Sequence, residues 1–382
     1  MNIGFACNWE KNKVETWSGT PYLLYESMKK LVGFNLYDLD INIKEFELLL
    51  YKLINLKLYK GKIKSKYVFS KLYLNAMKKK LLINLNKLQK IETLNAILEI
   101  GDIAILENFP FYIYQDLSLD LIIRYLKQNN EQLSGYELFN LDDLYKRKEW
   151  QLKVYEKCTG IFTMSKWLAN SLIKDTGLSS EKVHVVHAGI NIVPDSTNYI
   201  CEKSKRENII LFIGRDFFGK GGDIVVEAFN ILKVKYSSNL KLVIAGPKFW
   251  PLNSKIPNGI IFLGNTPREI IRKYYKIADL FCMPSRFEAF GIVFAEALSF
   301  GIPCIGREAC AMPEIIKQGI NGYLIDNENP EKLAELIVKV LEDNNMKFRV
   351  KKLSNNYKSY YSWDRVASDI AKIMKNDQIK IK

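Results

Sequence analysis

The stretch that decides the fold is PSRFEAFGIVFAEALSFGIPCI, at residues 284–305. It continues from an apolar run at 279–285, DLFCMPS, which is typical of a buried strand. A loop that carries Glu288 comes next, and an apolar helical pattern over 292–300 carries Glu296. One carboxylate alone could serve the helix dipole. Two carboxylates at a strand–turn–helix junction can bracket a polyhydroxylated ligand, because carboxylates accept hydrogen bonds from hydroxyls.

The second half of the chain repeats this alternation of strand and helix. Helical patterns such as 223–235 and 267–276 separate short apolar runs rich in β-branched residues. Near-continuous apolar strands alternating with helices predict a parallel sheet covered on both faces, as in a doubly wound Rossmann-type domain. The expected strands are 208–214, 240–246, 260–264, 279–285, 303–306 and 322–326.

The first half follows the same scheme more loosely. A chain of 382 residues is too long for one hydrophobic core. A polar segment without periodicity, at 194–207, marks the expected boundary between two domains. We expect an N-terminal domain over 1–195, a second domain over 196–358 and a C-terminal helix over 359–382. The expected strands of the first domain are 2–7, 35–41, 102–107, 160–165 and 183–186.

A glycine-rich loop, GRDFFGKGGD at 214–223, lies where a strand meets a helix. Glycines let the backbone approach a ligand, and Arg215 and Lys220 add two cations, so the loop suits a phosphate or diphosphate. The string also matches the start of a P-loop, but Gly221 stands where the magnesium-binding Ser or Thr belongs. A turn without any ligand is the remaining alternative.

The net charge of +14 is concentrated in one segment. Residues 51–90 hold twelve lysines and no Arg, Asp or Glu, which leaves +2 for the other 342 residues. Codon bias could account for the lysines but not for the missing acids. Apolar residues at helical spacing predict a helix over 68–88 that could rest on an anionic bilayer. An anionic polymer acceptor and a merely solvated helix are the alternatives, and no nucleic-acid motif accompanies the charge. The apolar positions are Val68, Leu72, Tyr73, Met77, Leu81, Leu85 and Leu88.

Other signals exclude several classes of protein. The six cysteines are scattered without a CxxC pair, and the sequence has neither a long apolar span nor a signal-peptide pattern, so we expect a cytoplasmic protein with reduced thiols. His184 and His187 fall in an expected strand, where they would face opposite ways, and no metal site is expected there. The DxD string at 38–40 lacks the context of a metal-dependent transferase.

Taken in order, these motifs resemble glycosyltransferase family 4, the retaining GT-B enzymes. The resemblance to the family's donor-binding domain covers about 208–326 and includes the strand end VIAGP, then FLGNTP, the stretch at 278–305 with its Glu-x7-Glu motif, and INGYLID. Weaker resemblance covers 16–31, which contains Gly19, and 164–191. It implies a GT-B fold of two Rossmann-like domains facing across a cleft, with the last helix crossing back to the first domain.

The resemblance also implies roles for residues. Arg215 and Lys220 would neutralise the donor diphosphate in place of a metal ion, and Glu288 would bind the donor sugar. Glu296 would hold the ribose hydroxyls. The family's N-domain histidine is absent, and Asp116 is the candidate that replaces it. The implied catalytic residues are thus Glu288, Asp116, Arg215 and Lys220. The implied donor contacts are Gly19, Gly214, Arg215, Lys220, Gly246, Gly264, Asn265, Ser285, Glu288, Ala289, Phe290, Gly291 and Glu296.

From this resemblance we expect a retaining, metal-independent hexosyltransferase that uses a UDP- or GDP-sugar and no prosthetic group. The leaving phosphate itself would accept the acceptor's proton. The expected acceptor is a cell-surface glycan or a lipid-linked saccharide, as in lipopolysaccharide, capsule or other polysaccharide biosynthesis. Peripheral contact with the inner face of the membrane would run through 51–90. The alternatives are a GT-B sugar-nucleotide epimerase and a non-catalytic nucleotide-sugar-binding subunit.

Overall fold

The protein forms two compact units. The computed structural model describes residues 1–59, 61–107, 109–129, 133–195, 207–236 and 239–381. Unit 1 comprises Met1–Gly189 together with Trp363–Lys382, and unit 2 comprises Ile190–Ser362. Of the expected boundary segment at 194–207, residues 196–206 lie outside the described residues.

Unit 2 is built on a six-stranded parallel sheet in the order β11-β10-β9-β12-β13-β14. The order reverses beside the first strand, β9, whose neighbours are β10 and β12. In an open parallel sheet this switch point is where the carboxyl ends of strands leave a crevice for a ligand. The strands are β9 (Asn208–Ile213), β10 (Leu240–Ala245), β11 (Ile260–Gly264), β12 (Leu280–Cys282), β13 (Cys304–Arg307) and β14 (Gly322–Ile325).

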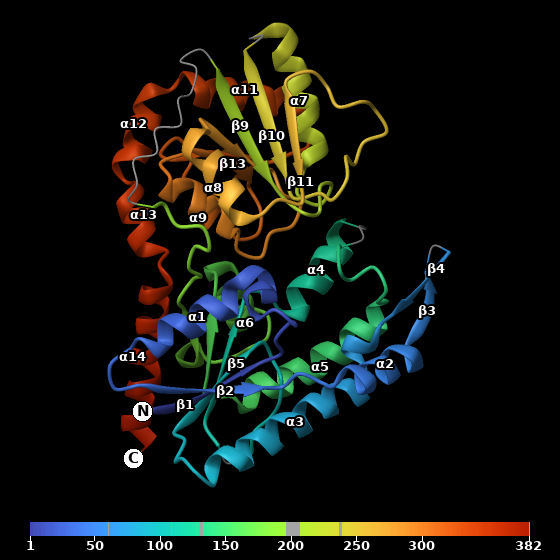
Figure 1. Cartoon of the computed structure of the whole chain (residues 1–382), viewed down its shortest axis with the longest axis vertical. Helices are drawn as coiled ribbons and strands as arrows, with labels where there is room; N and C mark the ends of the chain where they lie inside the picture. The colour runs from blue at the N-terminus through green and yellow to red at the C-terminus, as the bar shows by residue number, and fades with distance from the viewer. Residues whose placement is uncertain (60, 108, 130–132, 196–206, 237–238, 382) are drawn as a thin grey trace. The chain divides into compact units, whose positions relative to one another are not determined.

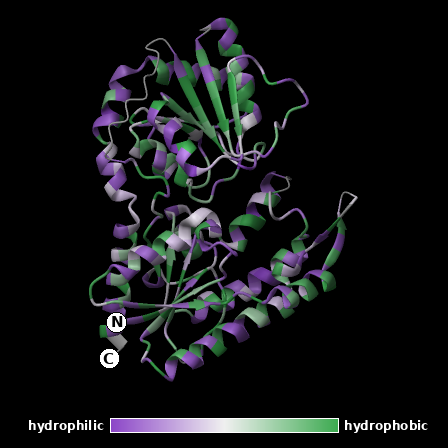
Figure 2. Cartoon of the chain, viewed as in Figure 1, coloured by the Kyte–Doolittle hydropathy of each residue, from purple (hydrophilic) through white to green (hydrophobic). Residues whose placement is uncertain are grey.

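Helices flank the sheet of unit 2 (Figure 1). The interior of β9, β10 and β12 is almost entirely buried, which is why these strands read as unbroken apolar runs (Figure 2). The helices are α7 (Gly222–Lys235), α8 (Arg268–Ile277), α9 (Ile292–Ser299), α10 (Met312–Ile315), α11 (Pro330–Glu342), α12 (Asn344–Lys352) and α13 (Ser354–Tyr360).

Unit 1 has its own six-stranded parallel sheet, in the order β2-β1-β5-β6-β7-β8. Its switch point lies between β1 and β5, the first and third strands of this sheet along the chain. The strands are β1 (Asn2–Cys7), β2 (Asn35–Asp40), β5 (Ala96–Ile100), β6 (Phe111–Gln115), β7 (Gly160–Thr163) and β8 (Val183–Val185).

The last helix, α14 (Trp363–Ile381), belongs to unit 1 and packs against α1 (Thr20–Lys29). Gly189 lies so close to Trp363 that a Cβ there would be 2.5 Å from the indole ring. Apart from α2 and α3, which are described below, the other helical elements of unit 1 are η1 (Lys13–Gly19), η2 (Tyr67–Phe69), α4 (Leu119–Asn129), α5 (Leu141–Lys157), α6 (Lys166–Lys174) and η3 (Ser180–Lys182).

One expected strand of unit 1 is wrong. Residues 102–107 form a loop, and the strand is instead β5, with β6 following it. The sequence of β5, AILEI, was not recognised as a buried strand because Glu99 interrupts the apolar run. Glu99 is nevertheless completely buried. The Glu99 carboxyl accepts hydrogen bonds from the backbone N–H groups of Ile103 and Ala104, at 3.0 and 3.2 Å, so it fixes the loop that follows. Asp116 consequently follows β6 and not the expected strand.

The basic segment folds into α2 (Glu45–Ile54), a hairpin of β3 (Leu56–Tyr59) and β4 (Lys62–Ser65), and α3 (Lys71–Gln89). The helix expected over 68–88 is therefore present as α3, but its apolar face is packed into the core of unit 1. Val68 and Leu72, which were expected on that face, are exposed. Val68 precedes the helix, which begins after its N-cap, Ser70, and Leu72 lies in the first turn, where Tyr73 and Leu74 are the buried residues instead. The buried residues of α3 are Tyr73, Leu74, Met77, Leu81 and Leu85.

Candidate functional site

Two loops meet at the switch point of unit 2. The glycine loop at 214–221 follows β9, and the loop that carries Glu288 follows β12. The Arg286 backbone N–H donates to the Gly219 carbonyl at 2.9 Å, and the Ser285 hydroxyl donates to the same carbonyl at 3.3 Å. The two expected donor-binding motifs, 72 residues apart from Gly219 to Gly291, are therefore neighbours in unit 2.

Glycines allow these loops to approach closely. Gly221 has a φ of 74°, and a Cβ on it would lie 2.5 Å from the carbonyl oxygen of Pro284. A Cβ on Gly246 would lie 2.6 Å from the Gly214 backbone, and the Gly246 N–H donates to the Gly264 carbonyl at 2.8 Å. Because no side chain fits at these contacts, the carboxyl ends of β9, β10, β11 and β12 form one continuous backbone edge.

Lys220 and Glu288 form the central ion pair of this edge. Lys220 Nζ lies 2.9 Å from Glu288 Oε2 and donates to the Phe287 carbonyl at 3.2 Å. The Glu288 side chain is 15% exposed and that of Lys220 27%, so both can reach a ligand after a small rearrangement. Arg215 is exposed and makes no hydrogen bond or ion pair with another described residue. The edge thus presents one unpaired cation, one exchangeable ion pair and backbone N–H groups.

An arginine network that the sequence analysis missed holds the Glu288 loop. Arg286 makes two hydrogen bonds to Asp223 in the first turn of α7, at 3.0 and 2.9 Å, and two to Glu328, both at 2.8 Å. Arg307 also forms an ion pair with Glu328. Burial alone would raise the pKa of Glu328, but the bonds and charges of the two arginines lower it. The only sequence signal was an arginine inside the motif itself, two residues before Glu288.

Glu296 lies on α9 and is almost completely buried. Its Oε1 accepts hydrogen bonds from the backbone N–H groups of Asn191 and Ile192 at 3.0 and 2.9 Å, and the Tyr275 hydroxyl donates to Oε2 at 3.0 Å. Burial raises the pKa of Glu296 to about 7, although these bonds oppose the shift. Three of the roughly four acceptor positions of this carboxylate are thus already used by the protein.

The remaining expected donor contacts of unit 2 differ in accessibility. Gly291 starts α9 with a φ of 92°, and Phe290 is buried beside Tyr361. Asn265, directly after β11, is exposed. Gly264 is the last residue of β11, and Ser285 and Ala289 lie on the loop after β12. The expected donor contacts of unit 2 thus fall along one edge of the sheet, apart from Glu296, which is buried on α9.

Unit 1 carries the two other expected residues, Gly19 and Asp116. Gly19 ends a loop after β1 in which Trp17, Ser18 and Gly19 all have left-handed backbone, with φ of 45°, 55° and 88°. Such a run is strained for the first two residues, and strain of this kind is concentrated at functional sites. Asp116 is partly buried directly after β6.

The sequence analysis also missed Asp102 as a candidate carboxylate of unit 1. Burial raises the pKa of Tyr136, and the negative charges of Asp116 and Asp102 raise it further. Asp102 forms an ion pair with Arg147 and accepts a hydrogen bond from Gln151 at 3.2 Å. Its position after β5 was hidden because 102–107 read as a strand.

No group of three or more His, Cys, Asp or Glu side chains within the described ranges could hold a metal ion. The chemistry that the edge of unit 2 offers is charge neutralisation by Arg215 and Lys220, with Glu288 as an acceptor for hydroxyl groups.

Residues 200–360 match the family described as "Glycosyl transferases group 1". An uncharacterized glycosyltransferase of Methanocaldococcus jannaschii is 29% identical over 242 residues, which cover 59% of this chain and 61% of that protein. Curated relatives of this kind are thus matched over less than two thirds of their length.

Two solved structures resemble the whole chain. Sucrose-phosphate synthase from Thermosynechococcus elongatus has a TM-score of 0.68 at 14% identity and covers 98% of both chains. HepE from Anabaena, in complex with UDP and glucose, has a TM-score of 0.64 at 15% identity and covers 98% of this chain and 99% of its own. The expected GT-B class, with two Rossmann-like α/β domains, is confirmed, and the comparisons support a glycosyltransferase.

Proposed function

We propose that this protein is a retaining glycosyltransferase of family 4 that transfers a hexosyl group from a nucleotide sugar. The observation that carries the proposal is the Lys220–Glu288 ion pair at the switch point of unit 2. When a donor binds, Lys220 turns to the diphosphate and Glu288 is released to accept hydrogen bonds from sugar hydroxyls. Both partners of the pair then have a new partner of suitable charge or polarity, so opening it costs little.

The proposed mechanism rests on charge stabilisation. As the bond between the anomeric carbon and the phosphate breaks, negative charge grows on the diphosphate, and Arg215 and Lys220 lie on the loop that would receive it. The leaving phosphate oxygen takes the proton of the acceptor hydroxyl, which attacks on the same face. The HepE complexes contain UDP and glucose or UDP-glucose, and we extend a UDP- or GDP-sugar donor to this chain as part of the proposal.

Glu296 receives a different role from the one expected from the motif. Because its oxygens bind the backbone at Asn191 and Ile192 and the Tyr275 hydroxyl, we propose that it fixes the first residues of unit 2 against α9. Its influence on the donor is then exerted through the position of α9, whose first turn follows Gly291.

A thermal-shift screen tests donor binding. A donor present at 100 times its dissociation constant should add about 2.7 kcal/mol to the free energy of unfolding, and only one base is expected to do so. The shift should vanish in the double variant Arg215→Gln/Lys220→Gln and persist in Lys235→Gln, a control on the far end of α7. If no UDP- or GDP-sugar shifts the wild-type protein, the donor proposal is wrong.

Turnover experiments test the reaction. NMR of the product should show the anomeric configuration of the donor, and EDTA should leave the rate unchanged if no metal is required. Conversion of the nucleotide sugar in the absence of any acceptor would instead identify the epimerase alternative. Binding of a nucleotide sugar without any turnover would identify the non-catalytic subunit.

For the acceptor we propose a cell-surface glycan or lipid-linked saccharide met at the inner face of a membrane. None of the helices in the described ranges has the length and apolar composition needed to span a bilayer. The apolar face of α3 is buried in the core, so the proposed membrane contact runs through α2 and the hairpin instead. An exposed apolar stripe on α2 continues onto β3 and β4: Phe46, Leu49, Leu50, Leu53, Ile54, Leu56, Leu58 and Ile63, each at least 43% exposed.

The composition of this stripe fits an anionic bilayer. Most surface helices turn such a stripe inward, whereas α2 has no completely buried residue. Lys52 is exposed on α2 beside the stripe, and a lysine near an anionic surface contributes about 1 kcal/mol. Lys57 and Lys64 pair on the opposite face of the hairpin from Leu58 and Ile63. The apolar side chains would enter the headgroup region while Lys52 meets the lipid phosphates.

Vesicle co-sedimentation tests this contact. Wild-type protein should sediment with phosphatidylglycerol vesicles and much less with phosphatidylcholine vesicles. The variant Leu49→Ser/Leu53→Ser should lose most of the binding, while Val234→Ser/Phe348→Ser, two exposed apolar residues of unit 2, should retain it. Equal binding of all three proteins would exclude α2 as the contact.

A further inference from the structure

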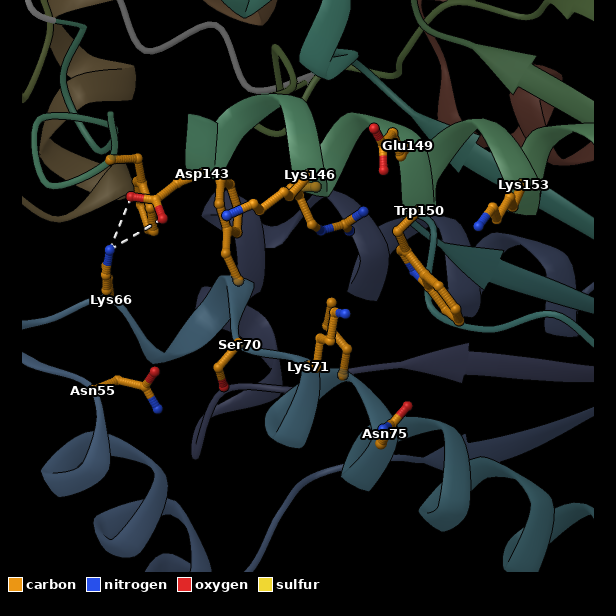
Figure 3. A pocket seen from close by; sticks show the side chains of 14 residues that line it. Asn55, Lys66, Ser70, Lys71, Asn75, Asp143, Lys146, Glu149, Trp150 and Lys153 are labelled. Atoms are coloured by element: carbon orange, nitrogen blue, oxygen red, sulfur yellow. Dashed lines mark hydrogen bonds and ion pairs between the residues drawn. The ribbon is translucent and has the colours of Figure 1, made fainter. Parts of the chain in front are cut away.

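A cavity of about 420 Å³ lies in unit 1, between the start of α3 and the middle of α5. The volume is within the range of small-molecule sites. Figure 3 shows Lys71 extending from α3 toward α5, and Trp150 extending from α5 toward α3. Phe69, Leu74 and Phe139 add apolar surface. The cavity therefore combines an apolar lining with polar groups from two helices.

The polar lining is rich in hydrogen-bond donors and poor in available acceptors. Asp143 is already paired with Lys66, whose Nζ lies 2.9 and 3.1 Å from its two carboxylate oxygens. Lys71, Lys146 and Lys153 are exposed and have no ion pair or hydrogen bond to another described residue. Glu149 is the one other acid of the lining. The charged lining thus holds three lysines without an ion pair and one carboxylate without one, beside the polar groups of Asn55, Ser70 and Asn75.

Two lining residues also carry unsatisfied N–H groups. Arg147 is 9% exposed, and its Nε has no hydrogen-bond partner in the described structure. Trp150 Nε1 is buried and also has no hydrogen-bond partner there. Both nitrogens are buried in residues that line the cavity, and a buried N–H group without a partner is destabilising, so a ligand that accepts hydrogen bonds and reaches them would be stabilised there. The two residues are three positions apart, which puts them on the same face of α5.

We propose that this cavity binds a phosphate ester. A phosphate carries up to two negative charges and several acceptor oxygens, which complement three unpaired lysines and a donor-rich lining. The apolar lining accommodates the group esterified to it. The ester can belong to a lipid or to a free sugar phosphate, since both present the same group.

The cavity adjoins the acceptor side of unit 1. Arg147, which lines it, also pairs with Asp102 at the end of β5, and Asp102 and Asp116 both act on Tyr136. If the proposed transferase reaction is correct, a phosphate ester held here anchors the acceptor through a group that does not react. This anchoring role rests on the proposed function, whereas the binding of the ester does not.

Calorimetric titration of the purified full chain tests the site. The probes are farnesyl phosphate, glucose 1-phosphate and inorganic phosphate, with farnesol as the uncharged control. We expect Lys71→Gln/Lys146→Gln to weaken the binding of the preferred phosphate at least tenfold. The matched control Lys79→Gln/Lys157→Gln changes two exposed lysines of the same helices that do not line the cavity, and its affinity should stay within twofold of wild type.

The order of the three probes identifies the source of the phosphate. Tighter binding of farnesyl phosphate indicates a lipid, and tighter binding of glucose 1-phosphate indicates a sugar phosphate. Equal binding of all three probes indicates that phosphate alone is recognised. Each of these results supports the site if Lys71→Gln/Lys146→Gln weakens the binding. No saturable binding, equal affinity in the two lysine variants, or equal binding of farnesol overturns it.

A second pair of variants separates this site from the donor site. Arg215→Gln/Lys220→Gln should still bind the phosphate ester, and Lys71→Gln/Lys146→Gln should still show the thermal shift with the nucleotide sugar. If the ester is lost only in Arg215→Gln/Lys220→Gln, the phosphate was occupying the donor loop, so the cavity proposal fails while the proposed transferase function stands.

Discussion

The two units place loops at the same topological position but hold them by different means. In unit 2 the loops after β9 and β12 are joined by the Lys220–Glu288 ion pair and by glycines that bring backbones together. In unit 1 the loop after β1 has left-handed backbone at Trp17 and Ser18, and the loop after β5 is fixed by buried Glu99. If unit 2 binds the proposed nucleotide sugar, its closely joined loops would hold Arg215 and Lys220 beside the diphosphate, and the loops of unit 1 would be left to bind the acceptor.

The strongest test of this contrast is Glu288→Gln. The variant keeps the size of the side chain but loses the charge that pairs with Lys220 and the second strong acceptor for sugar hydroxyls. We expect the transfer rate to fall about 10³-fold, equivalent to about 4 kcal/mol, because the interaction is needed where charge develops. The melting temperature should stay within about 2 °C of wild type.

Glu335→Gln, an exposed position of α11, is the matched control and should keep full activity. A Glu288→Gln variant as active as this control would remove Glu288 from the site. A variant that unfolds would instead give the ion pair a structural role.

The glycine contacts of unit 2 can be tested by adding one methyl group. In Gly221→Ala the new Cβ meets the Pro284 carbonyl and the residue must keep a φ of 74°, so we expect the free energy of unfolding to fall by about 3 kcal/mol. Gly319→Ala has nearly the same φ, 71°, but nothing within 4 Å of its Cβ, and should lose only about 1 kcal/mol. Urea denaturation of both variants gives the difference, and equal losses would show that close approach of the loops does not matter.

These contacts explain why unit 2 could be predicted from sequence and much of unit 1 could not. In unit 2 the residues of the two motifs contact one another, as Lys220 does with Glu288 and Gly221 with Pro284. The motifs that were recognised in the sequence are therefore the same residues that form the edge of the sheet. In unit 1 the strand β5 was missed because Glu99, an acid inside an apolar run, is buried where its carboxyl binds the next loop.

The basic segment shows a second limit of the sequence. Periodicity correctly predicted α3, but not which apolar helix faces solvent, since α2 and α3 both have apolar residues at helical spacing. The apolar face of α3 is buried because this helix covers the sheet of unit 1, where Met77 and Leu81 enter the core. Periodicity along the chain does not show which helix covers the sheet. Likewise the Glu-x7-Glu motif located both carboxylates but not the protein hydrogen bonds that occupy Glu296.

The buried state of Glu296 predicts a pH dependence of stability that comes from unit 2. Its pKa rises from 4.5 to about 7 on folding, so the folded chain holds this proton more tightly than the unfolded chain. Between pH 4.5 and 7 this group therefore makes the protein less stable as the pH rises, by at most about 3 kcal/mol. Glu296→Gln should remove the contribution of Glu296 to this slope, because an amide does not titrate, while its oxygen can still accept from Asn191 and Ile192. The contribution of buried Glu99 in unit 1, whose pKa is also raised by burial, should remain.

Thermal denaturation at intervals of half a pH unit measures the effect. Glu227→Gln, an exposed position of α7, should follow the wild-type curve. Parallel curves for Glu296→Gln and the wild type would mean that Glu296 titrates normally and that the proposed positioning role needs another explanation.

Asp116→Asn gives the smallest expected effect and the sharpest separation of the two units. We propose that Asp116 acts on the acceptor side, so the variant should lower the transfer rate about tenfold, equivalent to about 1.4 kcal/mol, and leave the thermal shift by the nucleotide sugar unchanged. Asp142→Asn, an exposed control on α5, should match the wild type in both measurements. Loss of donor binding in Asp116→Asn would show that this carboxylate contributes to the donor site, and the division of labour between the units would then be wrong. An unchanged rate would leave Asp102, the other carboxylate near Tyr136, as the acceptor-side residue to change next.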